Sequence, residues 1–232
     1  KVLIDGTHYN DYVNGYYSGN MTNFINMGTS DNIQVKIVQP GEEVTPEMLQ
    51  DVSLFVISAP LKYTSDYTGE AQPSVFEDEF VDAVSDYVNG GGTVVVCGLA
   101  DYQDANSGLP YTSYEQANKL LEGMGSTMRI NDDELIDQDE NGGQPYRLYF
   151  DDFNYDSTDP AVRSILEGVA ESGLAYSSYS GCSVSVGEGE AIVYGHDTTY
   201  SINSKAPAQG HEKPVLSYSA PYDASTAVVP KG

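Results

Sequence analysis

The chain has 232 residues, of which 40% are hydrophobic, and this size and composition are typical of one ordinary globular domain. Its 10 Lys and Arg residues stand against 35 Asp and Glu residues, and the resulting net charge of -25 repels nucleic acids and anionic lipid surfaces. No apolar run approaches the roughly 20 residues that a membrane-spanning helix needs. The composition therefore argues against nucleic-acid binding and membrane insertion.

Short β-branched, apolar runs alternate with helical segments along the chain. A strand covered on both faces shows such continuous rather than alternating hydrophobicity. By this criterion strands are expected over residues 1–5, 32–39, 52–60 and 92–98. Helices are expected where a capping residue precedes apolar residues at helical spacing. These N-terminal signals are Thr45 before Pro46, Ser74 with Glu77, Ser113 with Gln116, and Asp159 before Pro160.

This alternation predicts an α/β fold with a mostly parallel, doubly wound sheet. Helices on both faces would make three layers, and the flavodoxin-like strand order 2-1-3-4-5, with at least five parallel strands, is the expected one. Two further strands are expected around the turn at residues 187–189. We expect one domain over residues 1–204, followed by an irregular extension over 205–232 that is rich in Pro, Gly, Ser and Ala.

Ligands of such sheets bind at the carboxyl ends of the strands, near the point where the strand order reverses. Several polar residues follow the expected strands and would line this cleft. The predicted cleft residues are His8, Asn10, Asp11, Ser58, Asp101 and His196. Asn and Asp after a strand also cap turns, which is the alternative role for the residues that follow the first strand.

Residues 80–98, FVDAVSDYVNGGGTVVVCG, join a helix, a glycine run and a strand that ends in Cys97. This stretch resembles the nucleophile strand of class I glutamine amidotransferase-like domains. The resemblance implies a cysteine nucleophile followed, about a hundred residues later, by a histidine and an acidic residue. Cys97, His196 and Asp197 stand in that order here.

The chain is also similar to uncharacterised domains of this superfamily in large secreted bacterial surface proteins. The similar stretches are IDGTHYNDYVNGYYSGN, VVVCGLADYQD and NDDELIDQDENGGQPYRLY. This resemblance implies an accessory domain whose partners are other domains of the same longer chain. The first residues, KVLID, form an expected strand without an initiator Met, so we expect a longer precursor. The composition, with 19 Tyr, no Trp, few Lys and abundant Asn, Ser and Gly, together with this resemblance, favours a secreted or cell-surface location.

Two departures from the family pattern bear on catalysis. A nucleophile elbow needs small residues two positions before and after the nucleophile, where this chain has Val95 and Leu99. The usual His-x-Glu is replaced by His196 with Asp197 directly behind it. We therefore predict a non-catalytic, degenerate domain with a binding or structural role. The alternative is a cysteine-dependent hydrolase or amidase that uses Cys97 and His196.

The two cysteines allow two further states of the thiol. Cys97 could be a buried free cysteine at a strand end, because free cysteines are among the most buried residues. In an oxidising compartment it could instead form a disulfide with Cys182, which would stabilise the fold by roughly 4 kcal/mol in the chain-entropy model.

An acidic segment carries the first half of a calcium-binding loop. Asp137, Asp139 and Asn141 alternate, and a backbone carbonyl near Gly143 would be a fourth ligand. The closing glutamate is replaced by Leu148, so Asp151 or Asp152 would have to substitute. Calcium is the one cofactor that the sequence indicates, and a solvated acidic loop is the alternative.

Tyrosine-rich stretches suggest a third function. The chain has 19 Tyr and no Trp, with clusters in YVNGYY and YSSYS. Tyrosines can stack on sugars, so a carbohydrate-binding module is a further alternative, although tyrosines also suit half-buried surfaces.

Overall fold

The computed structural model describes residues 1–8, 10, 13, 15, 18–58, 60, 75–98 and 113–203. These residues divide into two compact units. Unit 1 holds the described residues up to Cys97 together with 113–126, and unit 2 holds Gly98 together with 127–203. The sequence predicts a single domain over residues 1–204, whereas the described residues of this range form two units. The expected extension over 205–232 lies outside the described residues.

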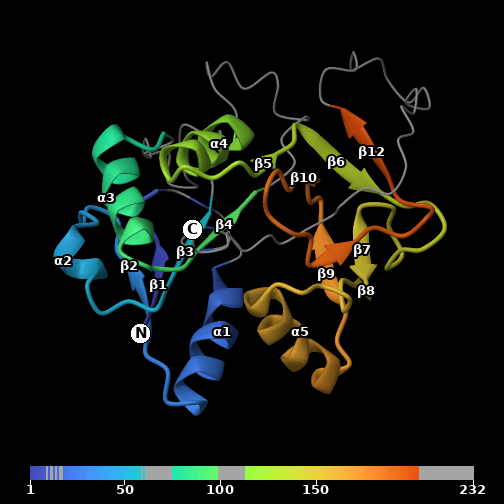
Figure 1. Cartoon of the computed structure of the whole chain (residues 1–232), viewed down its shortest axis with the longest axis horizontal. Helices are drawn as coiled ribbons and strands as arrows, with labels where there is room; N and C mark the ends of the chain where they lie inside the picture. The colour runs from blue at the N-terminus through green and yellow to red at the C-terminus, as the bar shows by residue number, and fades with distance from the viewer. Residues whose placement is uncertain are drawn as a thin grey trace. The chain divides into compact units, whose positions relative to one another are not determined.

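Unit 1 contains a four-stranded parallel sheet in the order β2-β1-β3-β4 (Figure 1). The strands are β1 (Val2–Asp5), β2 (Val35–Val38), β3 (Leu54–Ser58) and β4 (Val94–Cys97). All four apolar runs therefore form strands, in the first four positions of the predicted order. A fifth parallel strand is not found among the described residues, because the chain after residue 126 pairs in antiparallel ladders.

Four helices accompany this sheet: α1 (Gly19–Ser30), α2 (Pro46–Leu49), α3 (Asp78–Asn89) and α4 (Ser113–Gly123). Thr45 caps α2 as predicted, with Oγ1 accepting the backbone N–H of Met48 at 3.4 Å. The capping box expected at Ser74 is wrong, because Glu77 is the N-cap residue of α3 and Ser74 lies outside the described residues.

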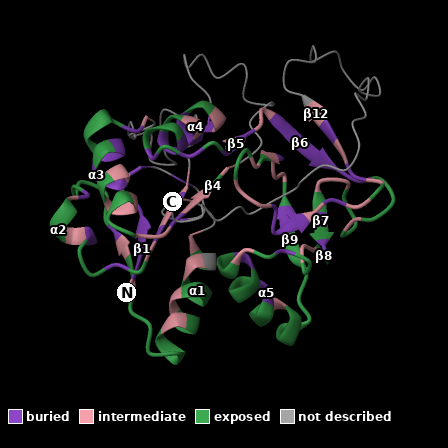
Figure 2. Cartoon of the chain, in the orientation of Figure 1, coloured by how far each residue is buried: buried purple, intermediate pink, exposed green. Residues whose placement is uncertain are grey.

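The core of unit 1 lies between the sheet and α3. Leu3, Phe55 and Ile57 are fully buried. The ring of Phe55 contacts that of Phe80 on α3, with centroids 6.3 Å apart. By contrast, the residues of α1 whose exposure is described, Gly19 and 21–30, are all exposed or half-buried, as Figure 2 shows.

Unit 2 is built from antiparallel two-stranded ladders and one helix. The paired strands are β5 (Arg129–Ile130) with β10 (Val184–Ser185), β6 (Asp133–Ile136) with β12 (Tyr200–Asn203), β7 (Arg147–Phe150) with β9 (Tyr176–Tyr179), and β8 (Asp152–Phe153) with β11 (Val193–Tyr194). The two strands expected around residues 187–189 are β10 and β11, but each pairs with an earlier strand rather than with the other.

The helix of unit 2, α5 (Pro160–Ser172), begins as its sequence predicts. Asp159 caps it by accepting the N–H groups of Ala161 and Val162, and Gly173 ends it in the left-handed conformation. Phe153 packs against two small buried clusters. One cluster is Leu135, Leu148, Phe150 and Val193, and the other is Val162, Leu166 and Ile192. Among the described residues no helix is both long and apolar enough to span a membrane.

Candidate functional site

Cys97 and Ser58 lie side by side at the carboxyl edge of the parallel sheet in unit 1. The two residues are register partners on β4 and β3, and their side chains form a hydrogen bond. Desolvation by the surrounding protein raises the pKa of the Cys97 thiol, and the hydrogen bond with Ser58 only partly opposes this. The net effect disfavours the thiolate that a nucleophile requires.

Neither cysteine is part of a disulfide in this structure, and the exposure of Cys97 differs from the sequence expectation. Cys97 is exposed by accessible area and Cys182 is half-buried, so the expectation of a buried Cys97 is wrong by that measure. Part of Cys97 is accessible to solvent, although the protein around its sulfur atom disfavours the negatively charged thiolate. Within unit 2 the Cys182 sulfur lies close to Gly98, the residue covalently bonded to Cys97. The predicted bridge stays a prediction.

His8 follows β1 and is held in a buried network. Its Nδ1 lies 2.7 Å from Asp5 Oδ2, and the Thr7 hydroxyl donates to Asp5 Oδ1 at 2.6 Å. The ring also makes edge contacts with Phe76 and Phe80, at centroid distances of 4.7 and 4.6 Å. His8 is therefore packed against two aromatic rings and held by the carboxylate of Asp5. Asn10 is buried as well, whereas Asp11 and Asp101 lie outside the described residues.

His196 belongs to unit 2 and lies among carboxylates. Its Nδ1 is 3.1 Å from Glu140 Oε2 and 3.9 Å from Asp137 Oδ2, and its Nε2 is 3.6 Å from Asp151 Oδ1. Both ring nitrogens are buried, and neither has a hydrogen bond of acceptable geometry among the described residues. Among the described residues, the acidic groups at this ring are Asp137, Glu140 and Asp151, and the adjacent Asp197 makes no such contact.

The fully buried carboxylate of Asp137 organises this region. Oδ1 accepts the backbone N–H groups of Asp139 at 2.9 Å and Glu140 at 2.7 Å. Oδ2 accepts the hydroxyls of Thr198 at 2.7 Å and Thr199 at 3.1 Å. Burial alone would raise the pKa of Asp137, but these four hydrogen bonds together hold it below its ordinary value.

The pairing of β6 with β12 explains why segments sixty residues apart meet here. Tyr200 is opposite Ile136 in this antiparallel ladder. Asp137 directly follows Ile136 and Thr199 directly precedes Tyr200, so the register brings these two residues together. Two predicted sites, the cleft residue His196 and the calcium loop, therefore share one location.

The predicted calcium ligands form a tight turn that is closed by internal hydrogen bonds. Asn141 Nδ2 donates to the Asp137 carbonyl at 2.9 Å, and Asn141 Oδ1 accepts the N–H of Gly143 at 2.9 Å. Gly143 has a φ of +92°, a conformation that glycine adopts freely. In the described residues no group of three or more His, Cys, Asp or Glu side chains has the geometry to hold a metal ion. Asp139 contributes its backbone N–H to the hydrogen bonds of this turn. Calcium binding stays a prediction.

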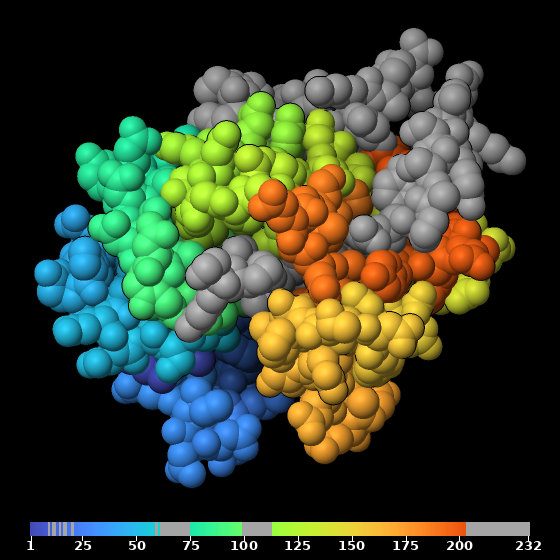
Figure 3. Space-filling view, viewed as in Figure 1, coloured from blue at the N-terminus to red at the C-terminus, as the bar shows by residue number. Residues whose placement is uncertain are grey.

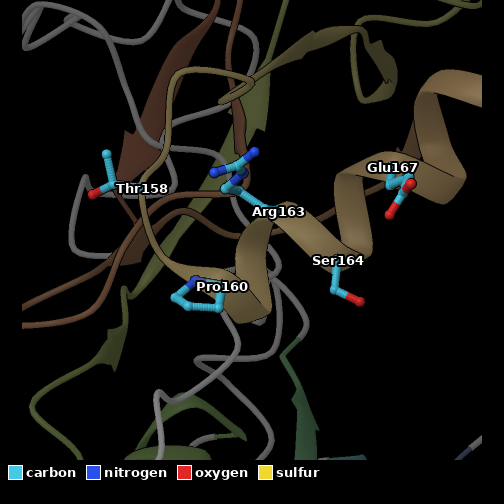
Figure 4. A pocket seen from close by; sticks show the side chains of 5 residues that line it. All are labelled: Thr158, Pro160, Arg163, Ser164 and Glu167. Carbon is cyan, nitrogen blue, oxygen red and sulfur yellow. The ribbon is translucent and has the colours of Figure 1, made fainter.

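A surface depression of about 530 Å³ lies beside the start of α5, whose outer face is exposed (Figure 3). Its lining residues are Thr158, Pro160, Arg163, Ser164 and Glu167. Figure 4 shows that these side chains do not converge, since Ser164 points away from Arg163. The depression therefore supplies no set of catalytic or ligating groups.

Three contributors were not foreseen from the sequence: Glu140 and the hydroxyls of Thr198 and Thr199. The signal for the two threonines was the segment HDTTY, in which hydroxyl residues follow a histidine. This segment alone does not predict that the threonines bind Asp137, because their proximity depends on the pairing of β6 with β12.

Comparison with known proteins bears on the fold and does not identify a family. The sequence matches no family model and no curated protein. A solved structure, "mmIFT52 N-terminal domain", is similar over 88% of this chain and 85% of that chain, with a TM-score of 0.55 and 15% identity. A putative ThuA-like protein from Bacteroides uniformis covers 84% of this chain and 67% of its own, at a TM-score of 0.39 and 12% identity. At these identities the likeness concerns the fold alone.

Proposed function

We propose that this chain is a non-catalytic domain of the class I glutamine amidotransferase-like type, with a binding or structural role in a secreted or cell-surface bacterial protein. Its partners are other domains of the same longer chain and a surface or carbohydrate ligand. Calcium at residues 137–143 is its proposed cofactor, and the charge and composition argue against nucleic acids and membrane interiors as partners.

The proposed fold is the three-layer, doubly wound sheet of flavodoxin-like proteins. Adjacent residues of a strand point to opposite faces, and register partners of parallel strands point to the same face. Phe55 is paired with Leu3 and contacts Phe80 of α3. Val35 is paired with Val2 and lies against Gly28 of α1. Leu3 and Val2 face opposite ways, which supports helices on both faces of the sheet.

The state of Cys97 carries the proposal that the domain is non-catalytic. An activated cysteine has a depressed pKa and a base within about 3 Å. Here desolvation by the protein around the sulfur raises the pKa of the thiol, and its hydrogen-bond partner is the hydroxyl of Ser58, which is a poor base. The two candidate histidines face carboxylates of their own: His8 faces Asp5, and His196 faces Glu140 and Asp151.

The test is a hydrolysis assay on the full chain with a matched cysteine variant. Ammonia release from glutamine and cleavage of activated esters should proceed at the same background rate with the wild type and with Cys97→Ser. Turnover above background that disappears in Cys97→Ser would replace the proposal with the cysteine-dependent hydrolase.

A further inference from the structure

One face of the β7–β9 ladder in unit 2 carries two exposed tyrosines, Tyr149 and Tyr179. The register pairs Arg147 with Tyr179 and Tyr149 with Ser177, which places these four side chains on the same face. Leu148 and Ser178, a pair on the opposite face, are buried. We call the exposed face, completed by the half-buried Tyr146, the tyrosine platform.

The rings of the platform are held in fixed positions. Tyr179 packs edge-to-face on Tyr146, with centroids 5.3 Å apart and planes at 77°. The guanidinium of Arg147 lies 5.2 Å from the centre of the Tyr179 ring, within cation–π range. Tyr149 lies on the backbone of Gly142, where an added Cβ would collide with the ring, and Gly142 donates its N–H to the Arg147 carbonyl at 2.7 Å. A preorganised surface loses little conformational entropy on binding.

The exposed area of the platform suits a small ligand better than a protein. Tyr149 is 52% and Tyr179 49% exposed. Since a tyrosine buries about 150–250 Å² when covered, the platform offers on the order of 300 Å² in total. A stable protein interface needs about 800 Å² from each partner. The area therefore disfavours both a second copy of this chain and another folded protein.

Charge narrows the ligand class further. A net charge of -25 repels polyanions such as nucleic acids and heavily acidic glycans. The platform offers tyrosine hydroxyls, the hydroxyl of Ser177 and the guanidinium of Arg147, and among the described residues no carboxylate pairs with Arg147. These groups are hydrogen-bond donors beside flat apolar rings. Sugar rings match both features, with an apolar C–H face and hydroxyls at the rim.

We propose that the tyrosine platform binds a neutral saccharide, whose C–H faces stack on Tyr149 and Tyr179 while its hydroxyls receive hydrogen bonds from Arg147. This inference deepens the proposed binding role and rests on it. It assigns the ligand to unit 2, whereas the carboxyl edge of the parallel sheet, where the sequence predicts the cleft, belongs to unit 1.

The experiment is a calorimetric titration of the full chain with three neutral oligosaccharides: cellohexaose, mannohexaose and chitohexaose. At least one should bind, and Tyr149→Ala and Tyr179→Ala should each weaken it by at least tenfold. Tyr155→Ala is the matched control, because Tyr155 is 54% exposed but lies outside the platform, and it should change affinity by less than twofold. Circular dichroism verifies folding, and Tyr149→Leu replaces the alanine variant if that variant unfolds.

Three results would overturn the inference. These are no binding of any of the three sugars at millimolar concentration, an equal loss of affinity in Tyr155→Ala, and a concentration-dependent dimer that Tyr179→Ala abolishes. The last would assign the platform to self-association. The hydrolysis assay is independent of this titration. An inactive protein that binds no sugar refutes only the saccharide site, whereas Cys97-dependent turnover refutes only the non-catalytic role.

Discussion

Replacing Asp137 tests whether its carboxylate organises the region around His196. Asp137→Ala leaves the backbone N–H groups of Asp139 and Glu140 without their acceptor, while the hydroxyls of Thr198 and Thr199 can turn to other partners. A stranded buried donor costs about 1–3 kcal/mol, so two donors in a turn near the surface should lower the free energy of unfolding by about 3 kcal/mol. Asp137→Asn keeps one oxygen that can accept both N–H groups. It should lower the free energy of unfolding by about 1 kcal/mol, because hydrogen bonds to a charged acceptor are stronger than those to a neutral one by about this amount.

The pH dependence of this loss has a defined sign. The pKa of Asp137 is lowered in the folded protein, so its stabilisation is fully present above the unfolded-state value of about 3.9 and disappears as the pH falls through the folded value. The difference between wild type and Asp137→Ala should be constant from neutral pH to about pH 5 and shrink below about pH 4. Urea unfolding followed by far-UV circular dichroism measures it. A loss below 1 kcal/mol, an equal loss in Asp137→Asn, or a difference that persists unchanged at low pH would refute the reasoning.

Three further predictions concern other parts of the chain. Calcium should raise the melting temperature; chelation should reverse this rise, and Asp139→Asn should abolish it. A melting temperature that does not change with calcium would contradict the proposed calcium site. Gly187→Ala should lower the free energy of unfolding, measured with a chemical denaturant, by about 1–3 kcal/mol. The reason is that Gly187 has a φ of +58° and that an added Cβ would lie 2.6 Å from the Thr127 carbonyl oxygen. An unchanged free energy of unfolding would show that this turn accommodates the side chain. Under oxidising conditions a disulfide between Cys97 and Cys182 should lower the intact mass by two hydrogens, and two thiols that stay free after prolonged oxidation would argue against the bridge.

The parallel strands were predictable because their residues carry the necessary pattern locally. Val94–Cys97 is a continuous β-branched run between glycines, and Asp159 before Pro160 marks a helix start by capping chemistry alone. The ladders of unit 2 were not predictable in the same way. Arg129–Ile130 is only two residues long and pairs with Val184–Ser185, more than fifty residues away, so its strand character comes from tertiary pairing.

The candidate site was predictable as residues but not as an arrangement. The alternation of Asp137, Asp139 and Asn141 marks a tight polar turn, which the structure contains. The sequence does not show that His196 lies against this turn, because their proximity depends on the register between Tyr200 and Ile136. For the same reason the sequence linked His196 with Cys97 by chain order, whereas its described acidic neighbours all lie in unit 2.

The alkylation rate of Cys97 tests the central claim, that this domain lacks a catalytic nucleophile, most directly. The reduced protein is treated with iodoacetamide at neutral pH, folded and in urea, and modification of each cysteine is followed by mass spectrometry. Because desolvation raises the pKa of the native thiol, Cys97 should react more slowly in the folded protein than in the unfolded chain, and His196→Ala should leave the native rate unchanged. Faster modification of Cys97 in the folded protein, lost in His196→Ala, would contradict the account and identify a cysteine–histidine enzyme.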